Sequence, residues 1–380
     1  MASYTQQSNL YLFISIVILF ITIGCIFIYS ASSVYALERY GLAHFYLKKH
    51  LIGCVLGLVA ISLSIIVPMH VIKKYTPLFF FFCLGLTILT FIPPFGISIH
   101  GSHRWIKVPF LIFQPSELLK VAFILYISYL LTKKNNLLNS FVRGYLPLLT
   151  IVGITSLVLL KQPDFGQAIT LTITAFMLFF IAECNIQYLL TTFASGLPII
   201  AFLIYLKPYR VKRILTFLNP WIDPQGAGFQ IIQSLIAIGS GNIWGVGIAK
   251  SKQKFFYLPM QHTDFIFSII AEETGFLGST LIITLYLMLF YVGIKIAQSL
   301  ENLFCFYATL GFSLLIALQA LINLGVATAL LPTKGLGLPF ISYGNSALIS
   351  ELIMVGLIIN FVKNNNKLKQ TINFNQSANA

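Results

Sequence analysis

The stretch LYLFISIVILFITIGCIFIYS, residues 10–30, contains no charged residue and is long enough to cross a membrane as one helix. A hydrocarbon core about 30 Å thick needs about 20 apolar residues of helix. This stretch is too long for the apolar core of a signal peptide, and no Lys or Arg precedes it. We therefore expect it to be retained as a first transmembrane helix.

Comparable apolar runs recur along the whole chain, which is 58% hydrophobic, only 9% charged and has a mean hydropathy of +0.88. Inside a bilayer the backbone must satisfy its own hydrogen bonds, and continuous apolar runs do so as helices. We predict an all-α, polytopic integral membrane protein with about ten transmembrane helices and one large loop. The spans are expected near residues 10–31, 50–67, 76–93, 115–132, 147–160, 167–182, 189–206, 265–294, 304–330 and 341–362.

The domain prediction is one transmembrane domain over residues 1–380, with a large loop at about 207–264 and a disordered tail at about 364–380. An even number of spans places both termini on one side. Nine Lys and Arg residues then lie with the termini and fourteen lie opposite, which would put the large loop in the cytoplasm. Seven of the fourteen lie in that single loop, so anion binding outside is the alternative explanation.

The five cysteines lie in or at the ends of apolar runs and form no CxxC pair. We interpret them as lipid-facing or core residues, and we expect neither a disulfide framework nor a zinc site. No cofactor follows from the sequence, and a need for a divalent cation is left open. Nucleic acid is not an expected partner.

The loop opens with KPYRVKRILTFL, residues 207–218, whose apolar side chains share one helical face opposite its cations. This pattern predicts a helix lying in the membrane interface. Two interpretations of its cations stay open. They anchor the helix against acidic lipids, or they hold a lipid-linked phosphate through charge-assisted hydrogen bonds. The candidate substrate-binding residues here are Arg210, Lys212 and Arg213.

The remainder of the loop is rich in Pro and Gly, in NPWIDPQGAGFQ at 219–230 and AIGSGNIWGVGIAKSKQKFFYLP at 237–259. Such density predicts irregular backbone with exposed N–H groups that suit sugars or phosphates. Further substrate-binding candidates in this region are Trp221, Asp223, Gln230 and Lys254.

The segment HTDFIFSIIAEETG, residues 262–275, leads from the loop into the eighth span. It places Asp264 at the mouth of the membrane, where an aspartate also fits the role of a helix cap. His262 is a second group that can accept a proton. Glu272 and Glu273 lie deeper and must be neutralised, paired or exposed to a cavity, because carboxylates inside a membrane are costly.

Two other polar segments interrupt the apolar runs. GSHRWIKVPFLIFQPSELLK, residues 101–120, contributes Arg104 and Lys107 as candidates for substrate binding, and its Glu117 and Lys120 are spaced to pair on one helical face. LLPTKGLGLPFISYGNS, residues 330–346, contributes Lys334 and Tyr343. Non-helical backbone at membrane depth is tolerated where it lines protein or a wet cavity, so we expect a pocket there.

Together, RWI, FQPSELLK, QPDFGQA, NPWIDPQGAGFQ, HTDFIFSIIAEETG and LPTKGLGLPFISYG resemble, in order and spacing, the SEDS family of cell-wall polymerases. The YRVKR, SKQK and LPTKG segments are more similar to the members that act in division than to those of elongation. The chain departs from the family pattern at Met260, where a glutamate is usual, at Asn345, where a glycine is usual, and at His103.

The resemblance implies ten helices with both termini cytoplasmic, the large loop in the periplasm, and residence in the bacterial inner membrane at the division septum. It implies a peptidoglycan glycosyltransferase that polymerises lipid II into β-1,4-linked strands, with Asp264 as the catalytic residue. Implied partners are a class B penicillin-binding protein, other division proteins and membrane lipid.

The chemistry of such a transfer requires one base. A sugar 4-hydroxyl attacks an anomeric carbon, while the diphosphate departs without needing a proton, so one carboxylate and nearby cations suffice. Two alternatives remain at this point: a lipid II flippase, which would bind at the membrane midplane, and a non-catalytic scaffold for division proteins.

Overall fold

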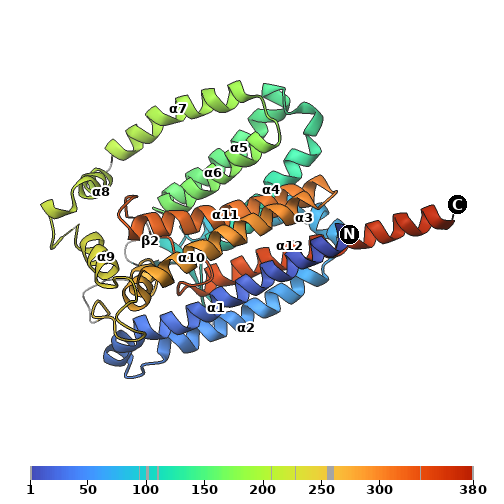
Figure 1. The fold of residues 1–380 in the computed structure, drawn as a ribbon. Coiled ribbons are helices and arrows are strands. Elements are labelled where there is room, and N and C mark those ends of the chain that lie inside the picture. Colours follow the sequence, from blue (N-terminus) through green and yellow to red (C-terminus); the bar gives the residue numbers. More distant parts are fainter. Residues whose placement is uncertain are drawn as a thin grey trace.

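The computed structural model describes residues 2–378, except 94, 100–101, 109–110, 207, 227, 255–260 and 334. Within this range the chain is mainly helical, which confirms the predicted fold class (Figure 1). The helices are α1 (Ala2–Tyr40), α2 (Phe45–Ile66), α3 (Met69–Leu89), α4 (Pro115–Lys133), α5 (Leu146–Lys161), α6 (Phe165–Ile181), α7 (Ile186–Tyr205), α8 (Pro208–Leu218), α9 (Phe229–Ser240), α10 (Ile266–Gln298), α11 (Leu303–Ala327) and α12 (Asn345–Ala378), with short turns η1 (Asn135–Leu137), η2 (Phe141–Tyr145) and η3 (Pro220–Ile222).

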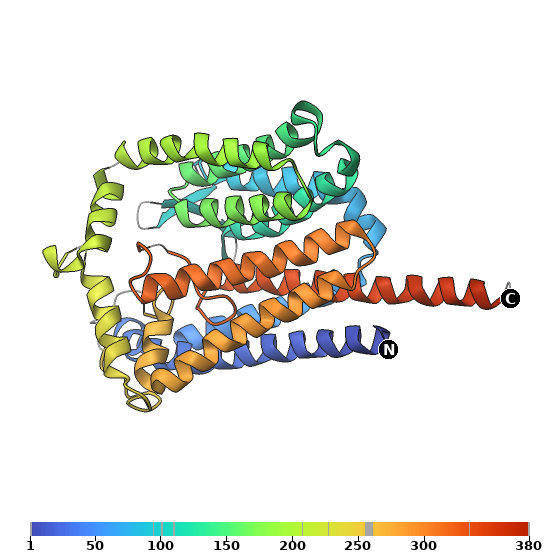
Figure 2. The same cartoon turned by 45° about the horizontal axis from the view of Figure 1, so that its top comes forward.

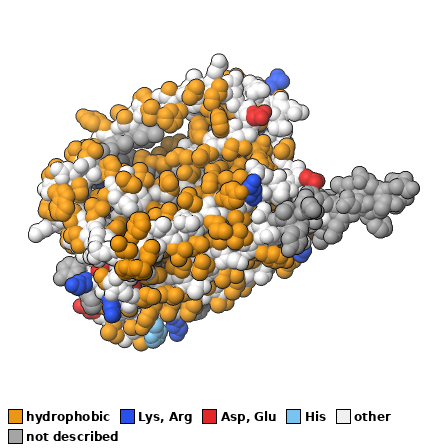
Figure 3. All heavy atoms as spheres, viewed as in Figure 1, with side chains coloured by type: hydrophobic (Ala, Val, Ile, Leu, Met, Phe, Trp, Pro, Cys, Tyr) orange, Lys and Arg blue, Asp and Glu red, His pale blue; other side chains and the backbone are white. Residues whose placement is uncertain are grey.

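The ten predicted spans coincide with α1–α7 and α10–α12. Eight helical stretches of the described chain are long and apolar enough to cross a membrane, which supports an integral membrane protein. The other two predicted spans fall on α6, which has 17 residues, and on the 20-residue α7. Hydrophobic side chains cover most of the flank of the bundle, as expected of a surface that faces lipid (Figure 3).

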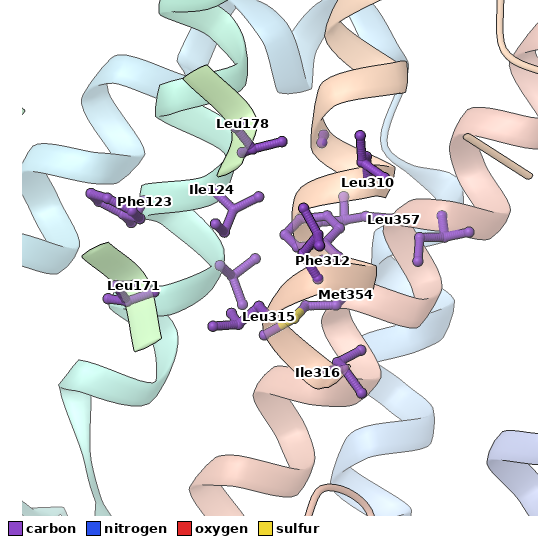
Figure 4. Packing of buried hydrophobic residues seen from close by; sticks show 14 of the residues in the cluster. Phe123, Ile124, Leu171, Leu178, Leu310, Phe312, Leu315, Ile316, Met354 and Leu357 are labelled. Carbon is purple, nitrogen blue, oxygen red and sulfur yellow. The ribbon is translucent and has the colours of Figure 1, made fainter. Parts of the chain in front are cut away.

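The core lies around α4, α11 and α12. In the apolar windows of α4 and α11, 72% of the residues are buried, against 17% in α2, which lies at the periphery. Figure 4 shows Ile124 of α4 directed toward Phe312 and Leu315 of α11, with Met354 of α12 beside them, while Phe123 lies on the opposite side of α4. These helices are therefore the rigid frame against which the polar segments are placed.

The large loop crosses one end of the bundle. Figures 1 and 2 both show α8 and α9 at that end and the two chain ends at the other. The predicted helix at 208–218 is present as α8. Phe229–Ser240 forms α9, which buries Ile231, Ile232, Ser234 and Ala237 and whose two ends extend into the segments predicted to be largely irregular.

A three-stranded antiparallel sheet, β1 (Gly96–Ile99), β2 (Ser102–Val108) and β3 (Leu111–Phe113), was not predicted and connects α3 to α4 in the order β1-β2-β3. At the other end, α12 is helical to Ala378 and so extends into the tail from residue 364, for which disorder stays a prediction. The Asn-rich and Lys-rich tail contains no Pro or Gly that would stop the helix.

Helix α10 is interrupted at Gly275, whose φ of 68° breaks the helical ladder. Residues 241–247 occupy the break. Phe276 N donates to Asn242 O at 2.8 Å, and a Cβ on Gly275 would lie 2.4 Å from Gly245 N. Glycine is thus required at 275 both by its backbone conformation and by this close approach.

Glu272 and Glu273, which precede this break, both accept hydrogen bonds. Glu273 accepts hydrogen bonds from Ser30 Oγ at 2.6 Å and Ala249 N at 2.9 Å, and Glu272 accepts one from Lys252 N at 2.8 Å. Both side chains are buried. The expectation that this pair must be partnered is met by hydrogen bonds to the loop, which fix the 249–252 segment on the first half of α10.

Candidate functional site

Asp264 lies in the turn that enters α10. The helix begins at Ile266 with Phe265 in the N-cap position, and no side chain caps it. Asp264 therefore does not act as the helix cap that the sequence also allowed. Its side chain is half-buried rather than exposed.

The backbone around Asp264 is fixed by the segment that precedes α12. Asn323 Nδ2 of α11 donates both to Asp264 O at 2.8 Å and to Leu336 O at 2.7 Å. Ser342 Oγ donates to Thr263 O at 2.6 Å. These bonds tie the entrance of α10 to residues 336–342, so the carboxylate has a defined position.

The carboxylate lies beside Gly335 of the LPTKG segment. A Cβ added to Gly335 would lie 3.3 Å from Asp264 Oδ2. Gly335 therefore leaves open the space beside the oxygen where any larger side chain would crowd it. Asn323 is not among the predicted site residues, although an asparagine inside an apolar span is a signal that could have found it.

Burial raises the pKa of Asp264 to about 6, while the positive charges of Arg104 and Arg213 act in the opposite direction. The negative charge of Asp164 adds to the effect of burial. Four charged groups from distant parts of the chain thus converge: one from β2, one from the turn before α6, one from α8 and Asp264 itself. A carboxylate with this pKa is an effective proton acceptor near neutral pH.

Arg104 holds its place through three contacts with the turn before α6. Its Nε donates to Gln162 O at 3.0 Å, its Nη2 donates to Pro163 O at 2.6 Å, and its Nη1 lies 3.5 Å from Asp164 Oδ2. Asp164 also caps α6 by accepting from Gln167 N at 3.3 Å, and burial raises its pKa. The guanidinium is therefore rigid, which suits a fixed positive charge.

His262 lies among tyrosines. Its ring centroid is 4.4 Å from that of Tyr46 and 5.7 Å from that of Tyr343, and its main-chain oxygen accepts from Tyr343 N at 3.0 Å. Burial lowers the pKa of His262 to about 4 and raises that of Tyr343 to about 12. Both side chains are consequently neutral at physiological pH.

The cations of α8 contact different parts of the chain. Arg213 Nη1 donates to Thr333 O at 3.4 Å, which links α8 to the LPTKG segment. Lys212 forms a salt bridge with Asp223 at 3.0 Å, and their side chains are 63% and 40% exposed. Such exposed pairs contribute little to stability. Arg210 lies on α8, but its side chain is outside the described residues.

The other predicted site residues lie in varied surroundings. Trp221 is 64% exposed, Gln230 is half-buried on α9 and Lys107 is exposed on β2. Lys254 is buried, and its Nζ donates to Ala249 O. Lys334 is outside the described residues, as is Met260, one of the positions where the chain departs from the resemblance.

An ion pair and two hydrogen bonds connect the site to helices α4 and α11 of the core. Glu117 and Lys120 of α4 form the predicted pair at 2.6 Å, and Lys120 Nζ also donates to Gln319 Oε1 of α11 at 3.2 Å. Gln319 Nε2 in turn donates to Gly337 O at 3.1 Å. The buried charges thus support the same 335–343 segment that holds Asp264.

Comparison of the sequence with known families gives a match over nearly its full length. A family model described as "Cell cycle protein" (FTSW_RODA_SPOVE) covers residues 10–367. The chain belongs to this FtsW/RodA/SpoVE family. Membership confirms the resemblance that the motifs indicated.

Curated relatives in this family are similar over most of their length. The chain is 42% identical over 337 residues to the probable peptidoglycan glycosyltransferase FtsW of Geobacter sp. (strain M18), covering 89% of this chain and 92% of the relative. It is 40% identical over 349 residues to the stage V sporulation protein E of Bacillus subtilis (strain 168), covering 92% and 95%.

Solved structures share the fold. A chain of a peptidoglycan synthase complex, described as coordinating polymerization and crosslinking, matches with a TM-score of 0.77 at 28% identity, covering 94% of this chain and 98% of that chain. The rod shape determining protein RodA of Thermus thermophilus matches with a TM-score of 0.70 at 24% identity, covering 93% and 96%. The latter likeness concerns the fold alone.

Proposed function

We propose that this chain is a peptidoglycan glycosyltransferase that polymerises lipid II into β-1,4-linked glycan strands during septal cell-wall synthesis. The names of its FtsW relatives, at about 40% identity over nine-tenths of the chain, support the enzyme class. The observation that carries the mechanism is the half-buried Asp264 carboxylate, whose pKa is about 6, set among Arg104 and Arg213.

The reaction balances with Asp264 as the only base. Its carboxylate takes the proton of the acceptor sugar's 4-hydroxyl as that oxygen bonds to the anomeric carbon of the donor. The bond from that carbon to the diphosphate breaks on the opposite face, with inversion, and undecaprenyl diphosphate leaves with the electron pair. General-base action of this kind accelerates a reaction by about 10²–10⁴-fold.

Cations near Asp264 would stabilise the negative charge that grows on the diphosphate. Arg104 and Arg213 are the two whose charges already act on Asp264. Arg210, Lys107, Lys212, Lys254 and Lys334 remain proposed contributors, with Trp221, Asp223, Gln230, His262 and Tyr343 as proposed contacts to the sugars or peptide. Arg104 is held by main-chain oxygens, so it would act without rearrangement.

The wider assignment follows the same family. We place the chain in the bacterial inner membrane at the septum as a single transmembrane domain, both termini cytoplasmic and the 207–264 loop periplasmic. The position of α8 and α9 at the end opposite the chain ends supports this orientation (Figure 2). A class B penicillin-binding protein and other division proteins are the proposed partners, since the matching complex couples polymerization with crosslinking.

The competing functions differ in what they require. A flippase would place its site at the membrane midplane, whereas Asp264 lies in the turn at the entrance of α10. A scaffold would need neither the raised pKa of Asp264 nor the two arginines. Both alternatives predict no polymer in a system without a bilayer.

The deciding experiment is polymerisation of lipid II by purified protein in detergent, with and without the transpeptidase partner. Wild type should produce glycan strands, and Asp264→Asn should lose about 10²–10⁴-fold in rate while still binding lipid II. Glu38→Gln is the matched control, because it removes an exposed carboxylate near the end of α1 that is not among the proposed site residues. Full activity in a folded D264N variant would remove Asp264 from the mechanism.

A further inference from the structure

Three potential metal ligands meet between the first two helices, away from Asp264. Cys25 comes from α1, and His50 and Cys54 come from α2. The sulfur atoms and an imidazole nitrogen all lie within 4.8 Å of one another. His50 and Cys54 are four residues apart, so one face of α2 presents both toward α1.

The histidine in this cluster lacks any other explanation among the described residues. His50 is 0% exposed, and its ring nitrogens have no hydrogen-bond partner outside the cluster, within which the Cys25 thiol lies close enough to interact with the ring. Buried polar groups in proteins are nearly always paired, and leaving one unpaired costs about 1–3 kcal/mol. A bound ion would satisfy the nitrogen that faces the two thiols.

We propose that Cys25, His50 and Cys54 bind a Zn²⁺ ion. Sulfur and imidazole ligands suit zinc, whereas Mg²⁺ and Ca²⁺ prefer oxygen. Zinc lies about 2.3 Å from sulfur and about 2.0–2.1 Å from nitrogen, so tetrahedral donors are about 3.5–3.8 Å apart. The three donors therefore need to close by only about 1 Å.

Charge balance favours zinc at this depth. Binding releases one proton from each thiol, and the two thiolates then cancel the charge of Zn²⁺. A neutral complex is tolerated inside a membrane, where an isolated charge is costly. Monovalent Cu⁺ with the same ligands would leave a net negative charge, which makes it the less suitable ion.

The ion would join α1 to α2 beside the candidate active site. Tyr46 lies one turn before His50 on α2, and its ring is 4.4 Å from His262 and 5.1 Å from Tyr343. A fixed α2 therefore fixes the tyrosines that surround His262. The role is structural, and it stands whether or not the chain polymerises lipid II.

Metal content of the purified full-length chain tests the proposal. Protein reduced and equilibrated with ZnCl₂, then freed of excess metal, should retain about one zinc per chain by mass spectrometry. Cys25→Ser, His50→Gln and Cys54→Ser should each retain less than about one-tenth of that. Cys184→Ser is the matched control, since it removes a buried thiol outside the cluster and should keep the zinc.

Cobalt supplies a second measurement that needs no variant. Wild type loaded with CoCl₂ should show thiolate-to-cobalt charge transfer and the visible bands of tetrahedral cobalt. Absence of these bands, or zinc retained equally by C25S and wild type, would overturn the proposal. A Cys25–Cys54 disulfide in the intact mass of unreduced protein would overturn it as well.

Discussion

The pH dependence of polymerisation is the most direct readout of the Asp264 environment. The base must be deprotonated, so activity is lost as pH falls through its pKa. With a pKa of about 6, about nine-tenths of the chains carry the carboxylate at pH 7, about half at pH 6 and about one-tenth at pH 5. An unperturbed aspartate would stay ionised throughout this range.

Removing a neighbouring positive charge should shift, in a known direction, the pH at which half of the activity is lost. Arg213 favours the ionised form of Asp264. Arg213→Gln should therefore raise the pKa of Asp264 further and move the loss of activity to higher pH. Lys295→Gln is the matched control, because it removes one positive charge from the last turn of α10, at the other end of the helix.

The assay measures initial rates of lipid II polymerisation in detergent at constant ionic strength from pH 4.5 to 8. Binding of lipid II and the folded fraction are measured at each pH, so that loss of substrate or of fold is separated from loss of the base. A rate that stays flat down to pH 4.5 would refute the raised pKa. If R213Q loses activity at the same pH as wild type, the electrostatic coupling between Arg213 and Asp264 is refuted.

Three further changes test the frame around the site. Lys120→Met removes the ion-pair partner of the half-buried Glu117 and should destabilise the chain by about 3–5 kcal/mol in thermal unfolding. The E117Q/K120M double variant should lose less, and a double variant at least as unstable as K120M would contradict this. Gly275→Ala should abolish monodisperse protein because its Cβ would meet Gly245 N at 2.4 Å, while Gly153→Ala, with open space around it, should not. Asp264→Asn should raise the melting temperature above pH 6 and leave it unchanged below pH 4, since the cost of ionising this buried carboxyl builds up between about pH 4 and pH 6 and is complete above that range.

The spans were predictable because each is a continuous apolar run that a bilayer allows only as helix. Their observed ends differ most where polar residues extend a helix beyond the membrane, as in α1 from Ala2 to Tyr40 and in α12 to Ala378. Hydropathy reports the solvent around a residue, and it does not report where a helix that leaves the membrane ends.

The small elements were missed for a different reason. Phe229–Ser240 is a 12-residue helix between glycine-rich segments, and those glycines dominated the prediction for the whole loop. The strands of the sheet are three to seven residues long and follow Pro and Gly. The sheet is held in place by distant partners such as the Gln162 carbonyl, which accepts from Ser102 Oγ at 2.9 Å and lies 60 residues away.

The candidate site was only partly predictable. The position of Asp264 before an apolar helix singled it out, and the helix of basic residues around Arg213 could be read from its periodicity. That Arg104 acts on the same carboxylate depends on how β2 packs against the turn before α6, which no local pattern encodes. The meeting of Cys25 with His50 likewise depends on how α1 faces α2, although the His-Cys spacing on α2 was visible.

The convergence of far-separated segments on Asp264 also has a consequence in time. Arg104 leaves the ribosome roughly 240 residues before Tyr343, an interval of about 12–48 s at about 5–20 residues per second. Asp264 follows Arg104 by 160 residues and precedes Tyr343 by 79, so the nascent chain holds both side chains only in the last part of that interval, still without the 335–343 support. Under the proposed function, a chain that ends before this segment lacks the support and should not polymerise lipid II.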